Sequence, residues 1–239
     1  MSYAIQPYLR NRFVFAFLGS MGVACRPARA QSAESPTATS RIAVGAHAGF
    51  ELPMGDAYRG NPVHNIVTSS IPAGVDLGYR FDQRLYIGLY GQYGFANARQ
   101  SSCIGCGYTI SGDAHAVKFG LNAEYDLAPV GSPRMPWLGV GFGYELLYAE
   151  HSGPGFRNSE RWRGFEWIRV AIGVDFEPIE RLRVGPYGGL SFAVYNRLRY
   201  RDQPEIPVSK TVGSDDGGGG SALHGWFTLG IRVNVTPFP

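Results

Sequence analysis

The segment WIRVAIGVDF, from Trp167 to Phe176, decides the fold because apolar side chains recur at every second position. In a β-strand this alternation separates two faces. One face carries Ile168, Val170, Ile172, Val174 and Phe176, and the other carries Trp167, Arg169, Ala171, Gly173 and Asp175. A water-soluble barrel turns the aliphatic face inward, whereas a lipid-embedded barrel turns it outward. The functional interpretation depends on which face meets the surroundings.

Segments with the same alternation recur eight times after residue 40, and no helical periodicity of useful length appears there. They lie near 41–52, 71–81, 85–97, 114–127, 136–149, 164–177, 182–196 and 222–235. Their connections alternate between short and long, with long ones near 53–70, 98–113, 150–163 and 197–221. Short periplasmic turns and long extracellular loops are typical of bacterial outer-membrane barrels. The sequence therefore predicts an all-β, eight-stranded antiparallel up-and-down transmembrane barrel over residues 41–239.

Each predicted strand is expected to keep one apolar parity throughout. The apolar rows are Ile42, Val44, Phe50 and Leu52; Val75, Leu77 and Phe81; Leu85, Ile87, Leu89 and Phe95; Val117, Phe119, Leu121 and Leu127; Leu138, Val140, Phe142 and Leu146; Ile168, Val170, Ile172, Val174 and Phe176; Leu182, Val184, Leu190 and Phe192; and Phe227, Leu229, Ile231, Val233 and Val235. The opposite parity carries glycines and ten charged residues, namely Asp76, Arg80, Lys118, Glu124, Asp126, Glu145, Arg169, Asp175, Arg183 and Arg232.

Composition favours the membrane barrel over a soluble, lipocalin-like lipid-binding barrel. The chain has 33 glycines among 239 residues, and charged residues make up only 17%. Eight strands enclose a bore just wide enough for side chains to fill, so small residues belong inside and the large apolar rows outside. Aromatic residues near strand ends are candidates for interfacial girdles: Tyr79, Phe81, Tyr93, Phe95, Tyr125, Trp137, Tyr144, Tyr148, Phe176, Phe192 and Phe227.

The N-terminal segment 1–30 is typical of a cleaved secretory signal. Arg10 and Arg12 precede the apolar run FVFAFLGSMGVAC, and Ala28 and Ala30 provide an A-x-A cleavage site. Residues 31–40 are small and polar, which predicts a flexible leader. Cleavage removes four arginines and no acids, so the formal charge of +3 becomes 18 basic against 19 acidic residues. This balance argues against a nucleic-acid partner.

At this level the chain resembles the small outer-membrane β-barrel proteins of Gram-negative bacteria, the OmpA-like, OmpX-like and OmpW-like group. The sharpest local match is TLGIRVNV, in which Thr228, Gly230, Val233 and Val235 have the spacing of a last-strand signal. The resemblance implies that the barrel-assembly machinery recognises this signal. It also implies location in the outer membrane, contact with its lipid and lipopolysaccharide, and a monomeric protein.

The ten charges of the bore consist of five positive and five negative residues, which can neutralise one another as an ion-pair network. Such a network would fill the bore, because side chains of this size leave little space for a continuous file of water. The alternative is a path for protons or ions. Removing one partner of a buried pair leaves an uncompensated charge, at a cost of about 3–5 kcal/mol.

The second long connection contains CIGC, formed by Cys103 and Cys106. Thioredoxin-type chemistry needs a helix N-terminus beside the pair, and no helical pattern follows. Tetrahedral zinc needs four ligands, and only His115 lies nearby in the sequence. In an exported protein the pair is therefore expected to form a disulfide, with no metal and no cofactor.

Arginines gather in the third and fourth long connections, where they are candidate contacts for lipopolysaccharide phosphates. The alternative is a solvated hairpin lip with Asp202 and Glu205 as partners. The candidates are Arg157, Arg161, Arg163, Arg197, Arg199 and Arg201, of which the last three continue one parity of the seventh strand.

A catalytic site near the outer rim is not expected. His115 and His224, with Ser111, Ser221 and Glu166, are the only loose candidates, and no spacing of nucleophile and base singles them out. The sequence predicts a structural or surface-interaction protein with a filled lumen that acts through its extracellular loops. The alternative is an OmpW-like transport barrel for apolar solutes, which a hydrophobic pocket opening through the wall would favour.

Overall fold

A computed structural model describes most of the chain from residue 41 onward. The described residues are 41–58, 60–82, 84–98, 101–102, 109–129, 132–153, 156–179, 181–202, 206–210 and 221–236. The predicted signal 1–30, the leader 31–40 and the cysteine pair 103–106 lie outside them. Those three predictions therefore stay predictions.

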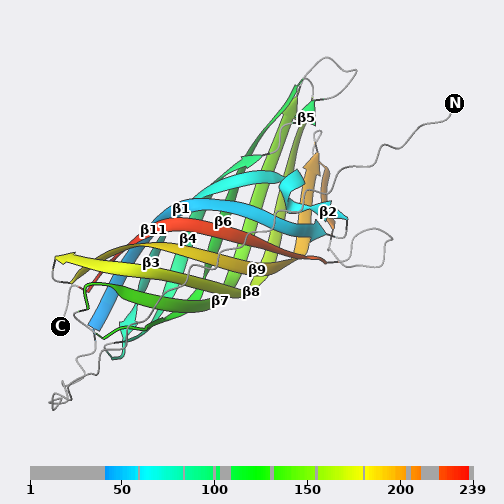
Figure 1. Ribbon diagram of the computed structural model, residues 1–239. Helices are drawn as coiled ribbons and strands as arrows, with labels where there is room; N and C mark the ends of the chain where they lie inside the picture. The colour runs from blue at the N-terminus through cyan, green and yellow to red at the C-terminus, as the bar shows by residue number, and fades with distance from the viewer. Residues whose placement is uncertain are drawn as a thin grey trace, which may run out of the picture. The chain divides into compact units, whose positions relative to one another are not determined.

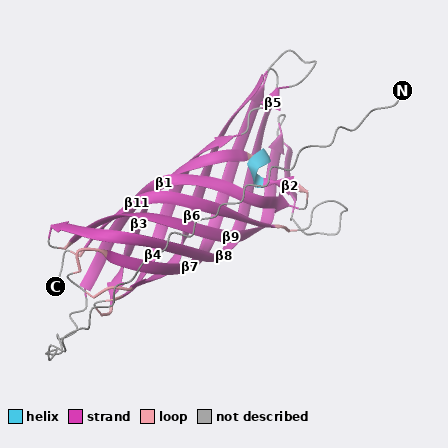
Figure 2. Ribbon diagram, in the orientation of Figure 1, coloured by secondary structure: helices cyan, strands magenta, loops and turns pink. Residues whose placement is uncertain are grey.

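The described chain is almost entirely β-strand (Figure 2). Its one helix in this part is a 3-10 turn of three residues, and no helix here is long and apolar enough to cross a membrane. The elements are β1 (Arg41–Tyr58), β2 (Asn61–Pro62), η1 (Val63–Asn65), β3 (Val67–Arg80), β4 (Leu85–Ala98), β5 (Ser101–Ser102), β6 (Thr109–Asp126), β7 (Met135–Gly153), β8 (Phe156–Ile179), β9 (Leu182–Asp202), β10 (Ile206–Lys210) and β11 (Leu223–Val235).

Eight of these strands form a closed antiparallel barrel. The order around the wall is β1, β3, β4, β6, β7, β8, β9 and β11, and β11 pairs with β1 to close it. Each strand lies beside the next long strand of the chain, and the strands run tilted around the barrel (Figure 1). The predicted eight-stranded up-and-down topology is confirmed. The short strands β2, β5 and β10 pair with β1, β6 and β9 and add nothing to the closure.

The two ends of the barrel differ, as the connection lengths predicted. The turn end holds the connections from β3 to β4, from β6 to β7 and from β8 to β9, while the hairpin end holds the others. The strands continue further toward the hairpin end than predicted. The segment 150–163 is a continuation of the β7–β8 ladder up to Gly153 and Phe156, and β10 pairs with β9 inside the fourth connection. Continuing the ladder gives the backbone N–H and C=O groups hydrogen-bond partners that a loop must find elsewhere.

The apolar rows face outward, so the aliphatic face of the segment 167–176 meets the surroundings of the barrel. Every residue predicted in these rows is exposed or half-buried, and Ile231 is 61% exposed. The rows contain no Asp, Glu, Lys or Arg. A soluble lipid-binding barrel needs the opposite arrangement, with the large apolar side chains around the axis.

Small residues on the inner face make room for large rings in the bore. A Cβ added at Gly173 would lie 2.7 Å from the Trp137 ring, and one added at Gly230 would lie 2.7 Å from the Tyr187 ring. Trp137 itself was predicted in an interfacial girdle, and that prediction is wrong, because the side chain is 3% exposed and lies inside the bore. Its residue number shares the parity of the inner face of β7, so its aromatic character misled the assignment.

Two strands break the expected constant parity. In β8 the register shifts between Glu166 and Ile168, so Trp167 is 63% exposed beside the outward Ile168. Trp167 was predicted on the inner face with Arg169, and the β-bulge reverses this, because an inserted residue exchanges the two faces of everything beyond it. In β9 the register shifts where Gly164 pairs with Tyr195 and Arg163 pairs with Arg197, which leaves Asn196 as the extra residue.

An apolar lid fills the bore at the hairpin end. We define the lid as Val63, Ile66 and Val67, which are at most 4% exposed and pack in one cluster with Leu147 and Trp162. Tyr58 stacks on the Trp162 ring at a centroid distance of 5.4 Å. The first long connection was predicted as an extracellular loop. Part of it instead turns back onto the barrel, because these side chains lose water contact there.

Candidate functional site

The charged residues of the inner face form layers across the bore. In the layer nearest the turn end, Asp126 accepts hydrogen bonds from Arg80 and Arg183, each over 2.6 Å. Arg232 donates two hydrogen bonds to Asp175, over 3.0 and 2.7 Å, and one to Glu124 over 2.6 Å. The Arg232 guanidinium also lies 3.4 Å from the Trp137 ring centroid.

The next layer combines neutral and charged groups. His47 Nδ1 lies 2.9 Å from Asp76, and the Asn122 amide donates to the same carboxylate over 3.2 Å. Further along, Arg169 donates to Glu166 over 3.3 Å and lies 4.3 Å from the Tyr90 ring centroid, while the Tyr90 hydroxyl donates to Glu166. A cavity of about 60 Å³, which is space for a few water molecules, is lined by His47, Asp76, Asn122 and Arg169 of this layer and by Arg232 of the first layer.

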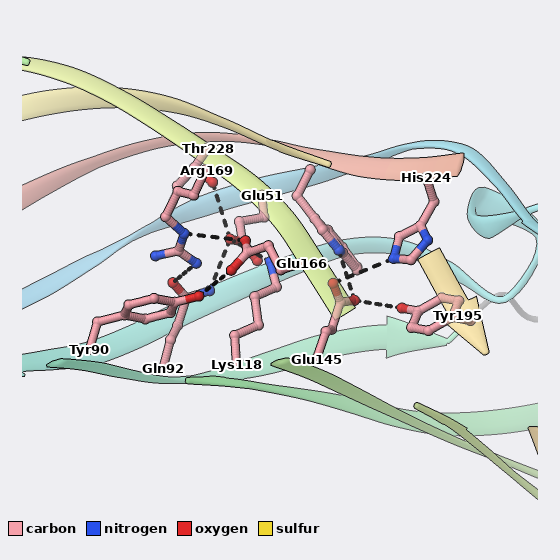
Figure 3. A network of polar contacts seen from close by, with 11 residues as sticks. Glu51, Tyr90, Gln92, Lys118, Glu145, Glu166, Arg169, Tyr195, His224 and Thr228 are labelled. Atoms are coloured by element: carbon pink, nitrogen blue, oxygen red, sulfur yellow. Dashed lines mark hydrogen bonds and ion pairs between the residues drawn. The ribbon is translucent and has the colours of Figure 1, made fainter. Parts of the chain in front are cut away.

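Glu51 is the centre of a third group of contacts (Figure 3). Its Oε1 accepts hydrogen bonds from Lys118 over 3.0 Å, from Gln92 over 2.9 Å and from Thr228 over 3.1 Å. The Lys118 and Glu51 side chains are each 1% exposed, so this ion pair is shielded from water. The Lys118 ammonium also lies 4.5 Å from the Trp226 ring centroid.

Glu145 is a second buried carboxylate with several donors (Figure 3). It accepts hydrogen bonds from the Tyr195 hydroxyl over 2.5 Å and from the Trp226 indole over 2.9 Å. His224 Nε2 lies 3.4 Å from its other oxygen, and the His224 ring stacks on Tyr195. Tyr195 and Trp226 also belong to the cluster under the apolar lid, so the polar layers and the lid are continuous.

The structure places all ten predicted lumen residues in these layers, but it pairs several of them with residues that the sequence analysis did not name. His47, Glu51, Glu166 and His224 are the partners of Asp76, Lys118, Arg169 and Glu145. The predicted balance of five against five omitted two carboxylates, Glu51 and Glu166. The signal for Glu51 was present, because it alternates with the outward Phe50 and Leu52. Glu166 gave no such signal, because the bulge at Trp167 hides its parity.

The loose catalytic candidates do not come together. His115 lies on the outer wall and stacks between Tyr93 and Tyr148, whereas His224 faces the bore. Glu166 is also in the bore, and Ser221 is exposed in an isolated bridge to Tyr58. The side chain of Ser111 is outside the described part. Among the residues with described placement, no group of three or more His, Cys, Asp or Glu could hold a metal ion.

Four of the six predicted phosphate contacts are described, and they share the outer wall at the hairpin end. Arg161 and Arg163 belong to β8, and Arg197 and Arg199 belong to β9. The side chains of Arg157, Arg201, Asp202 and Glu205 lie outside the described part. In the predicted assembly signal, Thr228 and Gly230 face the bore, while Val233 and Val235 are 36% and 37% exposed on the outer wall.

The barrel is similar to several solved structures of outer-membrane proteins. No protein-family model matches this chain, and no curated protein matches it. Solved structures with a similar fold include neisserial surface protein A (16% identity over 83% of this chain and 99% of that one, TM-score 0.44). They also include a major outer membrane protein from Thermus thermophilus (16%, 82% and 99%, TM-score 0.48) and the outer membrane protein OprG from Pseudomonas aeruginosa (14%, 82% and 96%, TM-score 0.45).

Proposed function

We propose that this protein is an integral barrel of a Gram-negative outer membrane. The observation that carries the proposal is the uncharged apolar belt on the outer wall. On β1 the belt runs from Ile42 to Leu52, ten residue steps or about 33 Å along the strand. At a strand tilt of about 40° this gives a height of roughly 25 Å, which equals the apolar band of outer-membrane barrels. The turn end then faces the periplasm and the hairpin end faces outward.

A bore filled with side chains fits a structural or surface-interaction protein better than a pore. The ion-pair layers cross the bore from Asp126 to Glu145, and the apolar lid covers the hairpin end. Opening a path would require breaking buried pairs such as Lys118–Glu51, each at a cost of about 3–5 kcal/mol. The hairpins beyond the belt are then the parts that present the protein to its surroundings.

Lateral transport of apolar solutes is the alternative function, and the continuous wall between β6 and β7 argues against it. A hollow on the outer wall is lined by Ile87, Leu121, Ala123, Val140 and Phe142, and it shares Asn122 and Val140 with the cavity in the bore. The two spaces are nevertheless separated by paired backbone. Asn122 pairs with Gly141 and Ala123 pairs with Val140 in an unbroken ladder between β6 and β7.

Outer-membrane fractionation followed by a detergent gel with and without boiling tests the location. We expect the protein in the outer-membrane fraction, with a mobility change on boiling as the barrel unfolds. Recovery in the soluble periplasm without a mobility change would overturn the proposal. Conductance of a planar bilayer holding the folded protein tests the filled bore, and steady open-channel current would contradict it.

A further inference from the structure

Two β-bulges on neighbouring strands turn four arginines from the bore to the outer wall. Below the bulges, the even-numbered residues of β8 and β9 face outward, including Ile172 and Leu190. Above them, Trp162 is 1% exposed in the bore and Leu198 packs against the same cluster. The residues that flank these two therefore face outward. They are Arg161, Arg163, Arg197 and Arg199, and we call them the arginine face.

The arginine face concentrates positive charge on one part of the outer wall. Arg161 lies opposite Arg199 and Arg163 lies opposite Arg197 in the register between β8 and β9. Directly opposed side chains have Cβ atoms about 5 Å apart, and like charges at this spacing destabilise a sheet. Among the described residues no carboxylate forms an ion pair with any of the four. The Nε atoms of Arg161 and Arg163 are buried and have no hydrogen-bond partner among the described residues.

The position of the arginine face matches the headgroup level of a membrane around the belt. Arg163 lies two residues beyond the outward Phe165 and four beyond Trp167, about 7 and 13 Å along the strand. Aromatic rings of this kind mark the membrane interface. A row of rings continues from the arginine face around the wall at the same level. Arg161 lies 4.6 Å from the Tyr148 centroid, and His115 stacks on Tyr148 at 4.5 Å.

We infer that the arginine face binds the phosphate groups of a phosphorylated glycolipid in the outer leaflet. This inference rests on the proposed outer-membrane location. A guanidinium presents a planar fork of donors that matches phosphate oxygens, and one phosphate can accept from both members of an opposed pair. Binding replaces the repulsion within each Arg–Arg pair by attraction to the shared anion. The bulges have a physical reason in this arrangement, because without them the arginines would point into a bore that already holds its own cations.

Titration of the folded full-length protein in neutral detergent with lipid A tests the inference. The variant R163Q/R197Q removes one opposed pair, while R84Q/R134Q removes the same charge from exposed positions at the turn end. We expect R163Q/R197Q to bind lipid A at least about tenfold more weakly, since one charge-assisted hydrogen bond contributes about that factor. We expect R84Q/R134Q to bind like the parent protein. R163K/R197K, which keeps the charge but loses the fork, should lie between them.

Two further arms identify the ligand. Dephosphorylated lipid A should bind the parent protein at least as weakly as phosphorylated lipid A binds R163Q/R197Q, because that variant keeps the pair Arg161 and Arg199. Inorganic phosphate at the same concentration should not displace the lipid, and displacement would assign the site to free phosphate instead. Equal binding of both lipids, or equal weakening by R84Q/R134Q, would overturn the inference. Each variant is first checked for a mobility change on boiling, and a protein that is not a membrane barrel fails this check. A folded barrel that binds both lipids equally contradicts this inference and leaves the proposed location intact.

Discussion

Replacing Lys118 by methionine should reveal how strongly the bore depends on its internal pairing. Lys118 and Glu51 are each 1% exposed and 3.0 Å apart. Removing the ammonium leaves the Glu51 carboxylate with two neutral donors, from Gln92 and Thr228. An uncompensated buried charge costs about 3–5 kcal/mol, and the two remaining hydrogen bonds place Lys118→Met near the lower limit, at about 3 kcal/mol. Glu51→Gln should cost about 4 kcal/mol, because it strands the Lys118 charge.

The double variant Lys118→Met/Glu51→Gln distinguishes an ion pair from two independent buried residues. With both charges removed, the new amide still accepts from Gln92 and Thr228, so we expect a total loss of about 3 kcal/mol rather than the sum of about 7 kcal/mol. Urea unfolding of the protein refolded in phospholipid vesicles, followed by tryptophan fluorescence, measures all three values. Losses that add to within about 0.5 kcal/mol would refute the reasoning, because independent sites behave in that way.

Three more predictions follow from the placement of single side chains. Ile231→Arg, at the centre of the outward row of β11, should lower the free energy of unfolding in lipid by about 2–4 kcal/mol. The control Thr68→Arg, beyond the belt, should change it by less than about 0.5 kcal/mol. Equal losses of stability in vesicle unfolding would contradict the belt. In proteins that retain one tryptophan, brominated acyl chains should quench Trp167 strongly and leave Trp162 unquenched; the reverse order would show that the β8 bulge is misplaced. At the turn end, hydrogen bonds from the backbone N–H groups of Leu85 and Arg84 lower the pKa of Asp82 below its ordinary value of 3.8. Asp82 therefore contributes stability that is present above that value and is lost as the pH falls through the lower folded pKa. Asp82→Ala should destabilise the parent at pH 7 and have a progressively smaller effect as the pH is lowered below 3.8, and a pH-independent difference would contradict the linkage.

Most of the fold was predictable from the alternation of apolar and polar residues along each strand. Rows such as Phe227 to Val235 predicted an outward face, because side chains on a strand change sides at every residue and the bore of eight strands is narrow. The same rule found the ten bore charges. The rule also places Trp137 and Glu51 in the bore, but aromatic character was given more weight than parity at Trp137 and the parity of Glu51 was not used.

The hairpin end departed furthest from the sequence-based expectations. Residues 150–163 were predicted as a long connection between two alternating segments, although they continue the β7–β8 ladder. The folding back of Val63 and Ile66 was also not predictable, since the cluster that buries them comes from strands far along the chain, at Leu147 and Trp162.

The strand number, the up-and-down order and the face that each strand turns outward below the bulges were predictable from residue order, because these properties depend on a local two-residue period and on connection lengths. The pairing of charges across the bore and the direction of Arg161, Arg163, Arg197 and Arg199 became known from the folded barrel. Pairing depends on which strands face one another around a closed wall, and a single inserted residue reverses every side chain beyond it. Neither the charge pairing nor the position of a bulge can be recognised in the local pattern of apolar and polar residues.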